Sequence, residues 1–229
     1  MKNKLLWQHL VVIIMSCLPL MYLALVWNNI PAQIPLHFDE SLKPDEIGEK
    51  IYAIIPSLVL ATVAIGIYFI FRNIHRIDPK RNTEAGKSVF YRLGFILAVF
   101  LTALNFITLI SMIEGVQLID KLMLPIMGLL FAVIGNYMHA IRPNYFAGIR
   151  LPWTLDNEVN WKRTHQLAGK IWFAGGVFIT VSTVFLPFLY AFKVVFATVI
   201  IMVLIPSIFS FWLFKKGNPD SSHQKNNSL

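Results

Sequence analysis

The amino-acid sequence predicts an all-α membrane protein in which six helices cross the bilayer and both termini lie in the cytoplasm. Three observations support this prediction. Hydrophobic residues make up 56% of the 229 residues and charged residues only 14%, whereas soluble domains carry about 25% charged residues. Six apolar segments are each long enough to cross about 30 Å of hydrocarbon. Lysine and arginine residues gather in alternate connecting segments, which is typical of multi-pass membrane proteins.

The six segments predict one transmembrane domain that covers residues 1–214. We expect spans at residues 5–27, 51–71, 89–113, 122–141, 171–192 and 194–214. The first apolar stretch exceeds the 7–15 residues of a signal peptide's apolar core, so we interpret it as a retained helix. Little more than Lys193 separates the last two segments, which predicts a tight helical hairpin. The polar residues 215–229 predict a disordered cytoplasmic tail.

The basic residues predict the orientation of the chain. With the N-terminus inside, 16 of the 20 lysine and arginine residues lie in inner segments. The outer segments hold only Lys43, Lys50, Lys121 and Lys193. This asymmetry follows the positive-inside rule, and it explains the formal net charge of +8 without a nucleic-acid partner. The outer segments also carry more acids than lysines, so the outer face should attract cationic ligands at short range.

No motif in the sequence indicates an enzyme. The patterns HExxH, GxSxG, Walker A and CxxC are absent, and no two of the six histidines have metal-ligand spacing on one helix. Cys17 lies in an apolar run, so we interpret it as a small buried apolar residue. The spans hold no charged residue at depth that would indicate a proton or ion relay. We therefore expect no catalytic residues, no metal site and no cofactor.

Polar residues inside the spans have two interpretations. They are Thr102, Asn105, Thr108, Asn136 and His139. Such side chains either form hydrogen bonds between helices or line a substrate path through the bundle. Gly128 and Gly135, seven residues apart in the fourth segment, would allow another helix to approach closely.

The outer segment 28–50 is longer than a connection between two helices requires. Its sequence, NNIPAQIPLHFDESLKPDEIGEK, contains three stiffening prolines and mixes the apolar residues Ile34, Leu36 and Phe38 with acids. We expect this segment to fold over the mouth of the bundle, either as a docking surface or as a lid without a ligand. The candidate ligand-contacting residues are Pro35, His37, Phe38, Asp39, Pro44 and Asp45.

The inner segment 142–169 is rich in prolines, aromatic residues and charges. Thr154 is placed to cap a helix whose first turn would hold Glu158. Asn157, Trp161 and His165 are spaced four residues apart, so they should share one face of that helix.

This inner segment also has two interpretations. Arg150 has five N–H donors that suit a carboxylate or a lipid phosphate, and Trp153 and Trp161 are residues typical of the membrane interface. The segment is therefore either an anchor that meets lipid headgroups or a cytoplasmic signalling surface. The candidate residues are Asn144, Gly148, Arg150, Pro152, Trp153, Thr154, Asn157, Glu158, Trp161, Thr164 and His165.

Both segments carry family resemblances. The outer one resembles a short N-terminal module of uncharacterised bacterial membrane proteins, although Leu42 and Ile47 stand where that pattern has Gly and Trp. The module is matched by Pro35, His37, Phe38, Pro44, Asp45, Gly48 and Lys50. The inner run, N-x(3)-GIR-x-PWTL-x-NE-x(2)-W-x(2)-TH-x(3)-GK, resembles the signature of the SdpI family of six-span bacterial membrane proteins. Leu151 is a small departure from that signature.

The resemblance implies a function. The family's namesake is an immunity protein of Gram-positive bacteria that protects its producer from a secreted, membrane-active peptide and draws a repressor to the membrane. We therefore expect a plasma-membrane receptor that contacts membrane lipid and a secreted hydrophobic or cationic peptide toxin. A cytoplasmic transcriptional repressor is a further option, and no direct contact with nucleic acid is expected.

Two other function classes stay open. One is a transporter, or a membrane-embedded enzyme, that acts on a peptide or a lipid. In that case Arg150 would bind an anionic headgroup and His165 would act as an acid or base. The other is a role in the cell envelope without a peptide partner.

Overall fold

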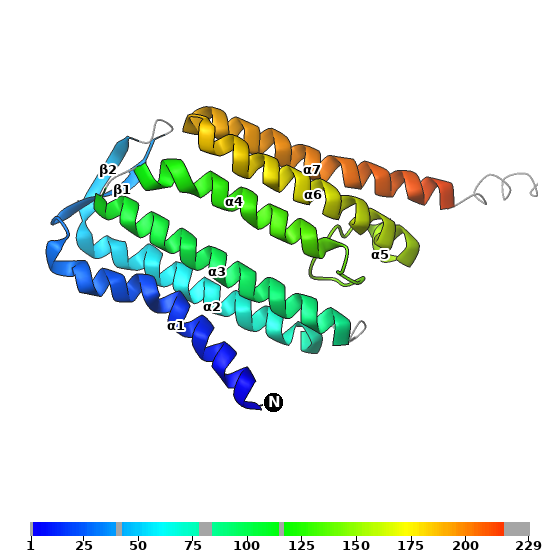
Figure 1. The fold of residues 1–229 in the computed structure, drawn as a ribbon, viewed down its shortest axis with the longest axis horizontal. Coiled ribbons are helices and arrows are strands. Elements are labelled where there is room, and N and C mark those ends of the chain that lie inside the picture. Colours follow the sequence, from blue (N-terminus) through cyan, green and yellow to red (C-terminus); the bar gives the residue numbers. More distant parts are fainter. Residues whose placement is uncertain (1, 40–42, 78–83, 115–116, 218–229) are drawn as a thin grey trace, which may run out of the picture.

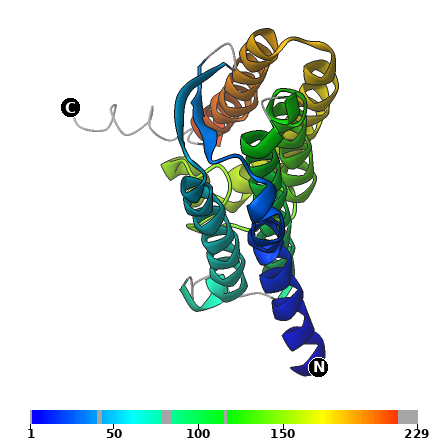
Figure 2. The same cartoon turned by 90° about the vertical axis from the view of Figure 1, so that its left-hand side faces the viewer.

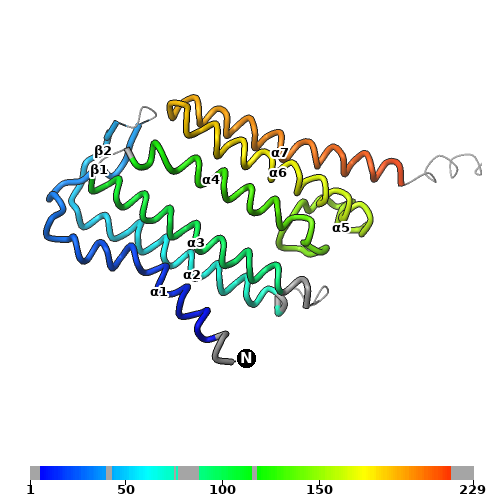
Figure 3. The backbone as a smooth tube through the Cα atoms, viewed as in Figure 1, coloured from blue at the N-terminus to red at the C-terminus, as the bar shows by residue number. Residues whose placement is uncertain are grey.

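The computed structural model describes residues 2–39, 43–77, 84–114 and 117–217. Within these ranges, six helices are long and apolar enough to cross a membrane. They are α1 (Lys2–Val26), α2 (Ile54–Ile77), α3 (Glu84–Glu114), α4 (Gln117–Met138), α6 (Glu158–Phe185) and α7 (Phe188–Gly217). The predicted all-α fold with six spans is confirmed (Figures 1 and 3).

Shorter elements connect the long helices. They are the 3-10 turns η1 (Trp27–Asn29) and η2 (Lys50–Ala53), the strands β1 (Gln33–Phe38) and β2 (Pro44–Glu49), and the one-turn helix α5 (Pro152–Leu155). The two strands lie at one end of the bundle, which we call the hairpin end (Figure 1). The opposite end carries α5, and we call it the signature end.

The long helices pack as two groups of three. Helices α1, α2 and α3 contact one another, α4, α6 and α7 form the second group, and α3 contacts α4 where the groups meet. In the first group Val12, Ala64 and Ala98 are fully buried, and in the second group Ile179 is. Each group therefore has its own apolar core between its helices.

Apolar side chains also cover the outside of the bundle. Leu25 and Phe185 are 83% and 81% exposed, respectively, which suits a surface in contact with hydrocarbon. Inside, the amide of Asn105 on α3 donates to the carbonyl oxygen of Ser57 on α2 at 2.9 Å. For Asn105 this contact favours the interpretation as a hydrogen bond between helices.

Helices α4 and α6 touch backbone to backbone. A Cβ added at Gly135 would lie 2.4 Å from the backbone nitrogen of Phe173, and one added at Gly176 would lie 2.2 Å from that of Ala132. Distances this short show that only glycine fits at these positions. The prediction that Gly128 and Gly135 allow a close helix approach is therefore confirmed.

The turn between the last two spans lies earlier than predicted. The sequence placed it at Lys193, but α6 ends at Phe185 and α7 begins at Phe188. Pro187 explains the difference, because proline removes a backbone donor and holds the preceding residue in an extended conformation. Leu186 accordingly has φ −103° and ψ 143°.

Several other boundaries also differ from the prediction. Helix α2 starts at Ile54 rather than residue 51, and α4 ends at Met138 rather than residue 141. Helix α6 starts at Glu158 rather than residue 171, because hydropathy does not detect the polar first turns of a helix. Helix α7 continues to Gly217, so residues 215–217 of the predicted tail are helical. Residues 218–229 lie outside the described part of the chain.

The outer segment 28–50 contains an antiparallel hairpin that we had expected only as a loop. Its register pairs Gln33 with Glu49 and Phe38 with Pro44, with irregularities on either side of His37. Figure 2 views the molecule from the hairpin end and shows the two strands in front of the helices. The described residues of this segment therefore form a defined structure at the end of the bundle.

The α4–α6 contact makes a prediction about stability. Gly135→Ala should destabilise the bundle by about 1–3 kcal/mol, because overpacking of a tight contact has that typical effect. Gly66→Ala on α2 is the matched control, since no other atom lies within 4 Å of its added Cβ. Thermal unfolding of both variants in detergent measures the difference. Equal melting temperatures would contradict the close contact.

Candidate functional site

The hairpin is fixed to the bundle by a buried isoleucine and a lysine. Ile34 of β1 is 1% exposed and packs in a cluster with Leu23 of α1 and Leu109 of α3. Lys50 donates from Nζ to the carbonyl oxygen of Trp27 at 2.9 Å, and Nζ lies 4.9 Å from the centre of the Trp27 ring. These contacts tie the hairpin to α1 and α3 and to the turn that follows α1.

The hairpin presents acids to its surroundings. Its exposed acids, which we call the acidic face, are Asp39, Asp45, Glu46 and Glu49. Ile47 is 64% exposed among them. His37 donates from Nδ1 to Oδ1 of Asp45 at 2.6 Å, which links the two strands. The arrangement therefore combines negative charge with one exposed apolar side chain on an ordered support.

The apolar residues of the outer segment turn largely toward the bundle. Ile34 is buried, and Leu36 and Phe38 are half-buried. A Cβ added at Gly48 would lie 2.3 Å from Cδ1 of Leu36, so a side chain there would displace that leucine. Leu42, where the sequence departs from the related pattern, lies outside the described residues.

The signature segment begins with a turn built around Asn144. Its Oδ1 accepts hydrogen bonds from the N–H groups of Phe146 and Ala147, both at 2.7 Å. Its Nδ2 donates to the carbonyl oxygens of Arg142 at 2.8 Å and Ala147 at 3.1 Å. Because all of these bonds are local, Asn144 fixes the shape of the loop.

The next part of the loop packs against His165 of α6. Gly148 has φ +104°, a conformation that favours glycine, and a Cβ there would lie 2.3 Å from Nε2 of His165. The N–H of Ile149 donates to that Nε2 at 3.0 Å, and Nδ1 bonds the carbonyl oxygen of Trp161 at 2.9 Å. Nδ1 therefore carries the proton and Nε2 accepts. Both ring nitrogens are occupied by these contacts.

Trp161 stacks on His165 at the centre of the signature end. Their ring centres are 4.0 Å apart with planes at 18°, and the indole N–H donates to the carbonyl oxygen of Ile141 at 2.9 Å. Trp161 is 1% exposed and packs in a cluster with Ile74 and Phe90. The prediction that Asn157, Trp161 and His165 share a helix face is confirmed for Trp161 and His165, whereas Asn157 lies just before the helix. The prediction that Trp161 lies at the membrane interface is wrong, because its ring fills this buried junction.

The start of α6 also differs from the prediction. Thr154 does not cap this helix, because it lies in α5, where its buried hydroxyl donates to the carbonyl oxygen of Leu151 at 2.6 Å. Asn157 is the N-cap, and its Oδ1 accepts from the N–H of Asn160 at 2.9 Å. Glu158 lies in the first turn, where an acid is favourable.

A polar cluster joins α6 to α7. The amide of Asn160 donates to the carbonyl oxygen of Ser210 at 3.0 Å and accepts from the Ser210 hydroxyl at 2.9 Å. Thr164 donates to Oδ1 of Asn160 at 2.9 Å, and Trp153 Nε1 donates to Oγ of Ser210 at 3.1 Å. Sequence analysis missed Asn160 and Ser210, because no spacing pattern marks residues so far apart in the chain.

The remaining signature residues stay exposed. They are Gly148, Arg150, Pro152, Asn157 and Glu158. Arg150 donates from Nη1 to the carbonyl oxygen of Tyr145 at 2.6 Å, and Tyr145 and Phe146 are 56% and 41% exposed. We call Tyr145, Phe146 and Arg150 the exposed corner. Most of the candidate residues at this end therefore form structural contacts, and this corner has the side chains best placed to meet a partner.

The described residues show no cluster of metal-ligating side chains. Across them, no three His, Cys, Asp or Glu side chains gather as a metal ion would require. Asn136 and His139 are exposed and line a pocket of about 520 Å³ together with Gln166 and Lys170. These two residues therefore face an outer pocket of the α4–α6 pair.

The histidine contact makes a second prediction. His165→Leu should destabilise the protein by about 1–3 kcal/mol, because the N–H of Ile149 loses its acceptor. Lys162→Leu, at an exposed position of the same helix, should stay within about 0.5 kcal/mol of the natural protein. Thermal unfolding and limited proteolysis of the signature segment measure both effects. A loop that stays protease-resistant in the His165 variant would contradict this role.

Comparison with known proteins finds two families along the chain. The family described as the SdpI/YfhL protein family matches residues 140–210, which include α5, all of α6 and most of α7. A domain of unknown function, DUF1648, matches residues 14–60, which include most of α1 and the hairpin. No solved structure matches the chain.

A relative of known name covers nearly the whole chain. The immunity protein SdpI of Bacillus subtilis (strain 168) is 24% identical over 211 residues, which are 92% of this chain and 98% of that protein. The six apolar helices and these matches place the chain in the plasma membrane as a multi-pass protein. The match over residues 140–210 and this similarity over nearly the whole chain relate the protein to the SdpI/YfhL protein family.

Proposed function

We propose that this protein is a membrane immunity protein that protects a bacterial cell from a secreted, membrane-active antimicrobial peptide. The similarity to the immunity protein of Bacillus subtilis over nearly the full length of both chains supports the immunity role. The observation that supports peptide capture is the acidic face, held in place by Ile34 and Lys50. The chain would act by binding rather than by catalysis.

The chemistry of the hairpin suits a cationic, amphipathic peptide. Four exposed carboxylates would attract its basic side chains, and Ile47 would contact its apolar side chains. The sheet has only two strands in the described part of the chain. Its outer edges can therefore accept an added strand from an extended peptide. Capture here would hold the toxin at the end of the bundle before it permeabilises the membrane.

This proposal places the hairpin outside the cell and the signature end in the cytoplasm. The bias of lysine and arginine toward the N-terminal, signature and C-terminal segments supports that orientation. Both termini would then be cytoplasmic.

Signalling would use the opposite end of the molecule. In the proposed orientation, Arg150 of the exposed corner faces the cytoplasm beside Tyr145 and Phe146. A cytoplasmic repressor would bind this corner when the peptide is captured. The peptide would have to bind two states of the bundle with different affinity, since a ligand without that difference shifts no equilibrium.

The capture site makes a third prediction. Asp45→Asn combined with Glu46→Gln should lower the peptide concentration that protected cells survive by about tenfold, which corresponds to about 1.4 kcal/mol of binding free energy. The amide oxygen introduced by Asp45→Asn can still accept the bond from His37, so the hairpin stays intact. Glu114→Gln, an exposed acid at the same end of the bundle but outside the hairpin, is the matched control. Survival of a susceptible Gram-positive strain under titrated secreted peptides measures the effect.

Three outcomes bear on the proposal. Equal protection by the hairpin double variant and the natural protein would contradict capture at the acidic face.

The thiol introduced by Ile47→Cys, in a Cys17→Ser background, should react with a membrane-impermeant maleimide in intact cells, and no reaction would contradict the orientation. Arg150→Ala should weaken peptide-dependent gene induction, and unchanged induction would remove the exposed corner from signalling.

A further inference from the structure

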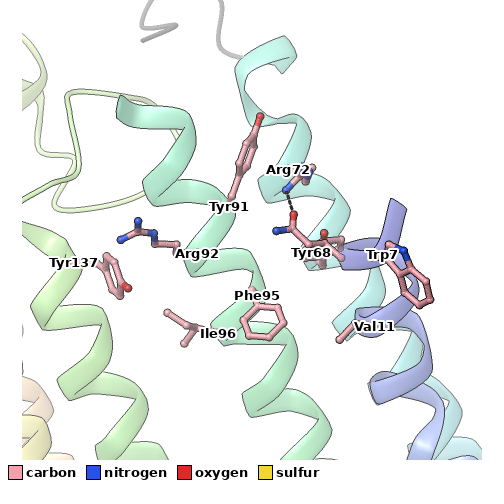
Figure 4. Close-up of a pocket in the computed structure, with 10 residues that line it drawn as sticks. Trp7, Val11, Tyr68, Arg72, Tyr91, Arg92, Phe95, Ile96 and Tyr137 are labelled. Atoms are coloured by element: carbon pink, nitrogen blue, oxygen red, sulfur yellow. Dashed lines mark hydrogen bonds between the residues drawn. The ribbon is translucent and has the colours of Figure 1, made fainter. Parts of the chain in front are cut away.

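A second pocket lies near the signature end, between α1 and α4 and across α3 (Figure 4). Its volume is about 530 Å³, and ten residues from α1, α2, α3 and α4 line it. Five of the ten are aromatic, and two are arginines. Neither the acidic face nor the exposed corner belongs to it.

The two arginines give the pocket its charge. Arg72 comes from α2 and Arg92 from α3, and no carboxylate is among the ten lining residues. Arg72 donates from Nη1 to Oε1 of Gln8 at 3.3 Å, and its guanidinium carbon lies 4.3 Å from the centre of the Tyr91 ring. The Gln8 bond uses one of the five N–H donors of the guanidinium. The aromatic contact orients the group while leaving donors for an anion.

Apolar residues occupy the part of the pocket farther from the signature end. Along α3, Phe95 and Ile96 follow Tyr91 and Arg92 by about one helical turn, and along α1, Val11 follows Gln8. Figure 4 shows this order, with the arginines toward the ends of α2 and α3 and the apolar side chains farther along the bundle. The pocket is therefore cationic near the end of the bundle and apolar toward its middle.

This gradient matches the structure of a membrane lipid. A phospholipid places its phosphodiester at the membrane surface and its acyl chains toward the centre. Guanidinium groups bind phosphate oxygens through paired N–H donors, and basic pockets between spanning helices on the cytoplasmic side are a known form of headgroup site. Val11 and Phe95 are 50% and 42% exposed, so this wall is open to an acyl chain from the bilayer.

We propose that this pocket binds one anionic phospholipid of the surrounding bilayer. The phosphodiester would lie between Arg72 and Arg92, and an acyl chain would follow Val11, Phe95 and Ile96. The lipid would fill the space between α1 and α4 and link the two groups of helices at the signature end. This inference does not depend on the proposed immunity function.

Lipid binding to the full-length protein tests the proposal. The protein, purified in a zwitterionic detergent, is titrated with dioleoyl phosphatidylglycerol, and bound lipid is counted by native mass spectrometry. Dioleoyl phosphatidylcholine and inorganic phosphate are the comparison ligands. We expect the anionic lipid to bind at least tenfold more tightly than the zwitterionic lipid, and millimolar inorganic phosphate not to displace it.

Variants separate the pocket from general surface charge. Arg72→Gln combined with Arg92→Gln should weaken binding of the anionic lipid by tenfold or more. Arg163→Gln, at an exposed position of α6 outside the pocket, should leave that binding unchanged. Ile96→Trp keeps both arginines but fills the acyl path, so it should also lower lipid binding. Melting temperatures of all variants without lipid show whether each is folded.

Four outcomes would overturn the proposal. The first is equal binding of the two lipids by the natural protein, and the second is anionic-lipid binding of natural strength by the folded arginine double variant. The third is a loss of lipid binding in Arg163→Gln as large as that in the double variant. The fourth is displacement of the bound lipid by inorganic phosphate. If the double variant does not fold, unchanged lipid binding by Ile96→Trp overturns the proposal in the same way.

Discussion

The backbone contact between α4 and α6 is the constraint on which the signature end depends. Gly135 of α4 and Gly176 of α6 leave no room for a side chain, so the two helices have one relative position. Helix α6 carries Trp161 and His165 at fixed distances from that contact. The loop that follows α4 closes onto these two rings. The indole N–H donates to the carbonyl oxygen of Ile141, and the imidazole accepts from the N–H of Ile149. Trp161, His165 and Thr154 are buried away from water, so their polar groups pair with protein partners.

This arrangement changes how the signature residues are understood. Asn144, Thr154 and Thr164 bond backbone and neighbouring side chains, and His165 uses both ring nitrogens in the same way. The signature segment, whose sequence suggested a binding or signalling site, is thus mainly a structural element that closes this end of the bundle. It leaves Arg150 and its neighbours to meet a partner. At the other end, Ile34 and Lys50 anchor a hairpin whose acids face outward, so function would lie on the exposed parts of two well-anchored segments.

The sequence predicted the class of fold well, because long apolar runs and biased basic residues are direct consequences of a bilayer. It also predicted the close approach at Gly135 and the shared face of Trp161 and His165, which follow from helical spacing. It missed the turn at Pro187 and the polar start of α6, because hydropathy measures apolarity rather than helical conformation. It did not identify the hairpin, whose strands are short and contain prolines. It could not pair Asn160 with Ser210, or place Arg72 and Arg92 on the wall of one pocket, because only tertiary packing determines these positions.

The central claim is that protection comes from stoichiometric capture of a peptide, and the most direct measurement compares captured peptide with the number of protein copies. Cells that express the protein at graded levels are exposed to a purified secreted peptide, and the peptide is then recovered from membranes and medium. Capture predicts that the tolerated peptide amount rises in proportion to copy number and that membrane-bound peptide is intact. Protection against peptide in large molar excess over the protein would contradict capture. Cleaved peptide would then indicate an enzyme, and intact peptide returned to the medium would indicate a transporter.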